Sequence, residues 1–76
     1  MAREIDLDEV MLSIETVRGW LAKVRESGPL LKGLDPEEIP DERCRVNDDG
    51  SLTIFVVLPG GEVSMDVSRS HWTYRH

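Results

Sequence analysis

The stretch Ile54-Phe55-Val56-Val57-Leu58, within the longer run from 51 to 58, decides the fold. Nowhere else do apolar residues fill consecutive positions over the length of a strand. A run rich in β-branched side chains and bounded by turn residues is typical of a strand with both faces at least partly covered. The rest of the chain offers two neighbouring strands and one amphipathic helix to cover it. The sequence therefore predicts an α+β fold, in which one N-terminal amphipathic helix packs on a three- to four-stranded antiparallel β meander in the order αβββ.

Two turns flank this strand and set its pairing. Residues 47–50, Asn-Asp-Asp-Gly, have the form of a type I turn followed by a left-handed glycine, which makes a three-residue hairpin loop with a bulge. The second turn covers residues 59–62, Pro-Gly-Gly-Glu. Both turns place apolar residues opposite each other on the same face of the sheet, which makes that face the core side. The expected partners are Val46 with Leu52, Cys44 with Ile54, Leu58 with Val63, Val56 with Met65 and Ile54 with Val67.

The opposite face of the meander carries two apolar residues, Phe55 and Val57. Their expected neighbours on that face are Thr53, Arg43, Arg45, Ser64 and Asp66. Water-facing strands of antiparallel sheets normally alternate more cleanly than this. We therefore expect either the C-terminal tail or another chain to cover Phe55 and Val57.

A helix is predicted at about residues 7–27. Asp6 and Glu9 have the spacing of a capping box, and Ile5 and Val10 have that of a hydrophobic staple. A Gly-Pro pair then stops the helix. Its apolar stripe, with alternating spacings of three and four, comprises Leu7, Val10, Ile14, Val17, Leu21 and Val24. A long coiled coil is one interpretation, but it needs more heptads, so a single helix lying on the sheet is favoured.

Gly19 is an anomaly in this helix, because a mid-helix glycine costs about 1 kcal/mol relative to alanine. Gly19 is expected near Leu12 and Ala22 on the helix face opposite the stripe. This face is either an ordinary surface with one stray leucine or a close helix–helix contact in a dimer.

The length of 76 residues predicts a single small domain, 1–76. Its parts are a helix at about 7–27, an acidic connector at 29–42, the β meander at 43–68 and a C-terminal tail or edge strand at 69–76. Within the connector, Asp35 before Pro36 is expected to cap a short helical turn, with Leu34 and Ile39 in staple spacing. The tail forms either a fourth strand, with Trp72 and Tyr74 on one face, or a disordered end that orders on a partner.

The net charge of −6 arises entirely in residues 1–42, which hold eleven acids and five bases. Such an acidic balance argues against direct nucleic-acid binding, which needs Lys and Arg against phosphates. Cys44 is the only cysteine, which excludes an internal disulfide and fits a reducing compartment. No segment approaches the roughly 20 apolar residues that cross a bilayer, and the N-terminus lacks the apolar core of a secretion signal. We therefore expect a cytoplasmic protein without membrane contact.

Small size also bears on assembly. A chain this short buries only about 60% of the surface that its unfolded form exposes. Small domains often compensate with disulfides, a metal or oligomerisation. With one cysteine and no cluster of metal ligands, the expected remedy is a homodimer, formed through Phe55 and Val57 or through Leu12 with Gly19.

No residue pattern in the sequence points to catalysis, so we expect a protein that is not an enzyme. Cys44, His71 and His76 lack the spacing of a metal site, and Cys44 falls on the core face, where an inert thiol is usual. The connector carboxylates lie in a flexible segment with no cleft around them. Gly60 and Gly61 form a turn rather than a phosphate loop, because no helix follows them. No catalytic residue, cofactor or metal is expected.

Three functional hypotheses follow. The first is a protein-binding module that acts by occupying a protein partner, as an inhibitor, adaptor or accessory subunit. The second is a nucleic-acid mimic whose acidic surface blocks a basic groove of a DNA- or RNA-handling protein. The third is a structural subunit of a larger assembly. The candidate partner-binding residues are Trp72, Tyr74, Arg75, Phe55, Val57, Asp35, Glu37, Glu38, Asp41 and Glu42.

Overall fold

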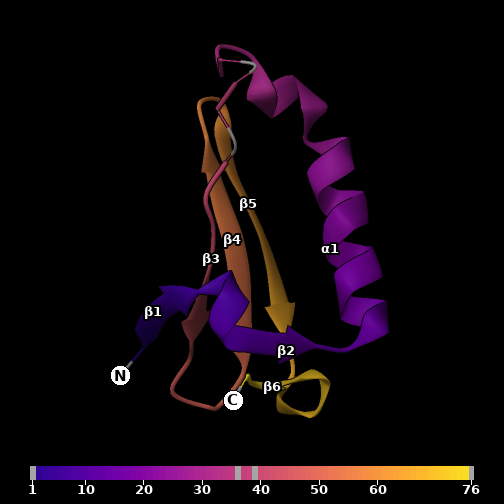
Figure 1. Ribbon diagram of the computed structural model, residues 1–76, viewed down its shortest axis with the longest axis vertical. Helices are drawn as coiled ribbons and strands as arrows, with labels where there is room; N and C mark the ends of the chain where they lie inside the picture. The colour runs from indigo at the N-terminus through magenta and orange to yellow at the C-terminus, as the bar shows by residue number, and fades with distance from the viewer. Residues whose placement is uncertain (1, 36, 39, 76) are drawn as a thin grey trace.

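The computed structural model describes residues 2–35, 37–38 and 40–75 (Figure 1). These residues form one α-helix and six strands in two antiparallel sheets, which confirms the predicted α+β class. The elements are, in chain order, β1 (Arg3–Asp6), η1 (Leu7–Glu9), β2 (Val10–Leu12), α1 (Ile14–Glu26), η2 (Gly28–Leu31), β3 (Glu42–Val46), β4 (Leu52–Leu58), β5 (Gly61–Val67), η3 (Arg69–His71) and β6 (Trp72–Tyr74). The helix therefore follows two strands, and its predicted N-terminal position is wrong.

The predicted central strand is β4, which lies inside a four-stranded sheet of order β1-β3-β4-β5. Its hairpin with β3 has the predicted register, since Val46 pairs with Leu52 and Cys44 with Ile54. In the loop between them, the backbone N–H of residue 47 donates to the carbonyl of residue 51 at 2.9 Å. Gly50 has a φ of +87°, the left-handed conformation that the bulged loop requires. The first turn therefore forms as predicted.

The second hairpin uses a tighter turn than predicted. Only Pro59 and Gly60 form the loop, because Gly61 already pairs with Leu58. The partners on β5 are consequently shifted by two residues from the predicted ones. A shift of two leaves every side chain on its original face, whereas a shift of one reverses them all. The predicted core side is thus correct although the register is not. The observed pairs are Leu58 with Gly61, Val56 with Val63, Ile54 with Met65 and Leu52 with Val67.

The N-terminal part of the predicted helix is not α-helical. The backbone N–H of Asp6 donates to Glu9 Oε2 at 3.0 Å, as a capping box requires, but the turn it closes is only the three-residue η1. The chain then extends as β2. Ser13 becomes the N-cap of α1, because its hydroxyl oxygen accepts a hydrogen bond from the Thr16 N–H at 3.3 Å. This second cap marks the true start of the helix, whereas the end at Glu26 lies within one residue of the prediction.

The buried side of α1 lies at one edge of the predicted stripe. With 3.6 residues per turn, the positions that follow Trp20 around the helix are Val24, Val17, Leu21 and Ile14 in that order. Exposure rises along the same path, from 3% for Trp20 through 40% for Val17 and 49% for Leu21 to 71% for Ile14. The helix is therefore rotated so that Trp20 faces the sheet, while three of the four stripe residues on α1, namely Ile14, Val17 and Leu21, are exposed.

The two stripe residues that precede the helix belong to other elements. Val10 is buried in β2, and Leu7 is half-buried in η1. Both still contribute to the core, Val10 from a strand and Leu7 from a short 3-10 turn, rather than from the α-helix. The prediction that all six stripe residues face the sheet from one helix is wrong.

Gly19 lies on the sheet side of α1. A Cβ at this position would be 3.7 Å from Met65 Sδ, an ordinary contact distance. Ala22 is exposed, and Leu12 belongs to β2 rather than to the helix. The helix face that the predicted dimer contact through Leu12 and Gly19 required does not form.

The C-terminal tail forms an edge strand, but of a different sheet from the meander. β6 pairs with β2, with Val10 opposite Tyr74 and Leu12 opposite Trp72. The fourth strand of the larger sheet is instead β1, which pairs with β3. Figure 1 shows α1 running alongside the β4–β5 hairpin, with β2 crossing near the lower end of the view.

The core lies between the larger sheet and the layer made by α1 and β2. Its buried residues are Ile5, Val10, Trp20, Cys44, Leu52, Ile54, Val56, Leu58 and Val67. Within the described part of the chain, no helix has the length and apolar character needed to cross a membrane.

Candidate functional site

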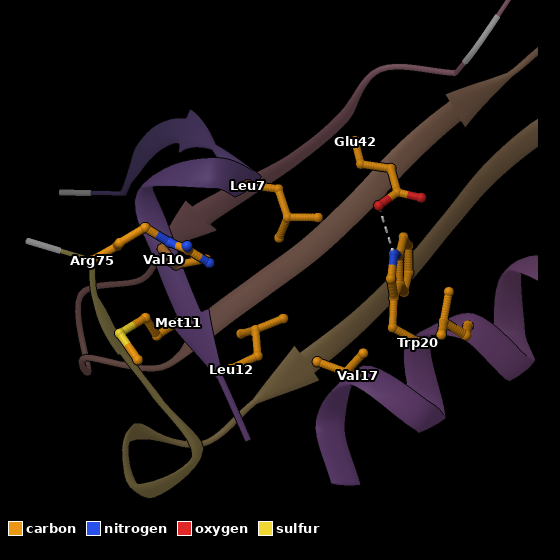
Figure 2. Close-up of a pocket in the computed structure, with 9 residues that line it drawn as sticks. Leu7, Val10, Met11, Leu12, Val17, Trp20, Glu42 and Arg75 are labelled. Atoms are coloured by element: carbon orange, nitrogen blue, oxygen red, sulfur yellow. Dashed lines mark hydrogen bonds between the residues drawn. The ribbon is translucent and has the colours of Figure 1, made fainter. Parts of the chain in front are cut away.

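A surface groove of about 350 Å³ lies between α1 and the η1–β2 segment (Figure 2). Its walls come from several elements and the chain end, and most of its lining is apolar. The lining residues are Leu7, Val10, Met11, Leu12, Val17, Trp20, Leu21, Glu42 and Arg75. We call this feature the apolar groove.

Trp20 anchors the apolar groove. Its side chain is buried, and its indole Nε1–H donates to Glu42 Oε2 at 3.1 Å. Glu42 is the first residue of β3 and is half-buried. A buried indole N–H needs an acceptor, and Glu42 supplies it while fixing the indole between the helix and the sheet. Figure 2 shows this hydrogen bond at one end of the groove.

Aliphatic side chains stand exposed around the groove. Met11, Val17 and Leu21 line it and are about half exposed, with Met11 at 53%. Ile14, three residues before Val17 on the same side of α1, is the most exposed of the four. Single exposed apolar residues are normal on protein surfaces, but a contiguous group of them marks an interaction site. Met11, Val17 and Leu21 share the groove, and Ile14 lies one helical turn before Val17 on α1. We call these four residues the exposed stripe.

Charged groups stand at the rim of the groove. Figure 2 shows Arg75 reaching toward Val10 from the end of β6, while Glu42 lies at the opposite end. The Arg75 backbone N–H donates to the Glu9 carbonyl at 2.8 Å, which fixes the end of β6 against η1. The groove thus combines an apolar interior with one acid and one base at its edges.

The tail residues Trp72 and Tyr74 make contacts within the fold and do not line the apolar groove. Trp72 is half-buried, and its Nε1–H donates to the Gly50 carbonyl at 3.0 Å. The Tyr74 ring packs edge-on against it, with 5.2 Å between the ring centroids. Of the three tail candidates, only Arg75 lines the apolar groove.

Phe55 and Val57 stay on the sheet face away from the core, as predicted, but the tail belongs to the other sheet. Phe55 is half-buried beneath Arg45, whose guanidinium carbon is 5.9 Å from the ring centroid. Val57 is 68% exposed. The neighbouring Thr53 is buried and donates to Asp66 Oδ1 at 2.8 Å. This face is therefore largely polar, with Val57 as its exposed apolar residue.

Four of the five acidic candidates, Asp35, Glu37, Glu38 and Asp41, do not line the groove. Asp35 makes a turn, in which its carbonyl accepts from the Glu38 N–H at 2.8 Å and its Oδ1 accepts from the Glu37 N–H at 3.1 Å. Asp41 pairs with Arg43 at 3.0 Å. The expected staple partner Ile39 and the helix-starting Pro36 lie outside the described residues.

Glu42 is the acidic candidate that lines the groove. The sequence pattern placed Leu7, Val10, Val17 and Leu21 on the core side of the helix and Leu12 on the opposite face, as a stray surface leucine or a dimer contact with Gly19. It gave Met11 and Trp20 no role, although all of these residues except Gly19 line the groove. The sequence did contain a signal for an exposed apolar surface. The stripe together with Trp20 occupies a wider arc of the helix circumference than one buried side can cover. A helix that buries only one side must expose the other apolar residues.

Cys44 is fully buried on the core face, and its thiol lies 3.5 Å from the Ile5 carbonyl. Burial raises the pKa of this thiol from 9.0 to about 11, and the nearby acids Glu9, Asp6 and Asp8 add to the effect. The thiol is therefore protonated at neutral pH, and a protonated thiol is a poor nucleophile. Among the described residues, no group of three His, Cys, Asp or Glu side chains could hold a metal ion.

The raised pKa of Cys44 predicts a loss of stability at alkaline pH. Above pH 9 the unfolded chain releases the thiol proton, while the folded chain holds it until about pH 11. The protonated thiol therefore makes its full contribution to the free energy of unfolding below pH 9, and this contribution is lost as the pH rises toward 11. Urea unfolding across this range should show a steeper decline for the native chain than for Cys44→Ala. Parallel pH profiles for the two proteins would contradict this assignment.

Comparisons with models of protein families, with curated proteins and with solved structures found no match to this chain. The geometry of the apolar groove is therefore the basis for the functional proposal.

Proposed function

We propose that this chain is a small, non-enzymatic protein-binding module that acts in the cytoplasm by occupying a protein partner, as an inhibitor, adaptor or accessory subunit. The observation that carries the proposal is the exposure of Met11, Val17 and Leu21 around a groove built on Trp20. In a chain with 32% charged residues, such a concentration of apolar surface needs a reason. Contact with a protein supplies one, because apolar clusters of this kind mark interaction sites.

The composition of the groove supports a protein partner. Interfaces typically have an apolar centre and a polar, solvent-accessible rim. Here the exposed stripe and the groove interior form the centre, while Glu42 and Arg75 form the rim. Binding energy concentrates in side chains that become fully desolvated at the centre. Self-association belongs to the same proposal, because a second copy is one protein that this surface can contact.

A nucleic-acid mimic is the second candidate, and one observation favours it. Asp35, Glu37 and Glu38 are all exposed in the connector. Their carboxylates could face a basic groove of a DNA- or RNA-handling protein. Binding of that kind would weaken steeply as salt rises, whereas binding through the apolar groove would depend on salt only at its rim.

The test compares capture of partners from the native cell by the unchanged chain and two variants. Leu21→Asp places a charge in the groove wall, and Val57→Asp is the matched control on an exposed strand position outside the groove. We expect Leu21→Asp to weaken partner binding by about tenfold or more, and Val57→Asp to leave it unchanged. Titration of the captured partner against each variant measures the effect.

A triple variant, Asp35→Asn, Glu37→Gln and Glu38→Gln, tests the second candidate. If it abolishes binding while Leu21→Asp does not, the groove is not the contact and the mimic is favoured. Each variant must keep the melting temperature of the unchanged chain, so that loss of binding is not loss of fold.

A further inference from the structure

The exposed half of α1 has the composition of a ligand for the apolar groove. Ile14, Val17 and Leu21 lie on one side of the helix, at spacings of three and four residues. Arg18 follows Ile14 by four positions and Arg25 follows Leu21 by four, so each arginine lies beside the stripe. Both arginines are exposed. The helix therefore presents Ile14, Val17 and Leu21, which we call the α1 stripe, with Arg18 and Arg25 beside them.

Charges of both signs lie around the groove, with Arg75 at one end and acids at the other end and before β2. Residues 3–9 hold four acids and one base, and they lead directly into β2 on the far side of the groove from α1. Glu42 lines the groove at the end opposite Arg75, and the indole of Trp20 donates to one of its two carboxylate oxygens. A carboxylate at the edge of an apolar interface favours a partner that brings an arginine.

We infer that the apolar groove takes the α1 stripe of a second copy of this chain, so that two copies form a two-fold dimer. The inference rests on the proposed function, because it names the partner of the same groove. Since α1 also forms one wall of its own groove, both stripes can be covered in the same encounter, as an isologous interface requires. The dimer removes Met11, Ile14, Val17 and Leu21 from water and brings arginines toward Glu42.

Other surfaces offer less to a second copy. Val57 is exposed on a sheet face where it pairs with Glu62, and the other apolar residue of that face, Phe55, is half-buried beneath Arg45. The outer edge of β5 is partly occupied, because Lys23 Nζ donates to the Ser64 carbonyl at 2.8 Å. A charged side chain that covers a strand edge, as Lys23 of α1 does here, discourages pairing with another chain. The groove and the stripe are thus the better-matched pair.

Light scattering and sedimentation over a micromolar concentration range test the dimer. The unchanged chain should show twice the mass of 8.6 kDa. Leu21→Asp and Ile14→Asp should each raise the dimer dissociation constant by about tenfold or more, and Val57→Asp should not change it. Ile14 is the first residue of α1, where a carboxylate is favourable to the helix, so this variant should fold.

The charge pairing has its own test. Glu42→Gln keeps an acceptor for the Trp20 indole but removes the charge, so it should weaken the dimer without unfolding the chain. Arg18→Glu and Arg25→Glu test the two arginines in the same way. If none of the three changes raises the dimer dissociation constant, the proposed pairing of these arginines with Glu42 is wrong.

Two outcomes would overturn the inference. One is a mass of 8.6 kDa at every concentration, and the other is a dimer that survives both Leu21→Asp and Ile14→Asp. If the chain is monomeric but Leu21→Asp still abolishes capture of another protein, the inference fails while the proposed function stands. If the dimer forms through the groove and no other protein depends on Leu21, the inference stands and the role as inhibitor or adaptor fails.

Discussion

Replacing Ile54 with alanine is expected to lower the free energy of unfolding by about 2–4 kcal/mol. Ile54 is fully buried in the middle of β4, opposite Cys44 on one side and Met65 on the other. The loss has two parts, because burial of the deleted carbons no longer stabilises the fold and the surrounding side chains cannot close the space. Small domains have only about 5–15 kcal/mol of stability in total, so this is a large fraction.

Urea unfolding measures the effect, with Val57→Ala as the control. Val57 lies on the same strand but is exposed, so its truncation should change stability by less than about 0.5 kcal/mol. The same experiment on Val56, also buried, should resemble Ile54. An Ile54→Ala protein with the melting temperature of the unchanged chain would mean that the core is not where β4 places it.

Removing residues 69–76 is expected to lower stability by several kcal/mol and to unfold much of the population. The deletion removes β6, the pairing partner of β2, and uncovers the buried Val10. It also removes the hydrogen bonds from the backbone of residue 13 to that of residue 71, from Trp72 to Gly50 and from Arg75 to Glu9. Apolar area returned to water costs about 25 cal/mol per Å², which adds to the loss.

Trp72→Phe is the matched variant for the truncation. It keeps an aromatic ring in place and removes the indole N–H whose hydrogen bond the Gly50 carbonyl accepts, so it should cost only about 1–2 kcal/mol. Thermal unfolding by circular dichroism measures both changes. A truncated chain with full stability would show that β6 is not part of the fold. Because β2 also forms one wall of the apolar groove, loss of binding in the truncated chain would be a consequence of lost structure.

Less of the candidate site than of the fold could be predicted from the sequence. Glu42 and Arg75 were both expected to bind a partner, and both lie at the rim of the apolar groove. The expectation placed them in two separate segments, an acidic connector and an aromatic tail. Their meeting depends on where β2, β3 and β6 lie in space, which no local pattern encodes.

The sequence by itself determined the central strand, the first hairpin and the side of the sheet that faces the core. These follow from local chemistry, because Gly50 permits the left-handed turn and the side chains of β4 alternate with a period of two. Only the tertiary structure decided where the helix begins, which side of it is buried and what the tail pairs with. Residues 10–12 fit the helical pattern, yet they pair with residues 72–74 at the other end of the chain. Pairing between such distant segments overrides the local helix propensity of residues 10–12, because it buries Val10. The local sequence does not show which distant segment will supply that contact.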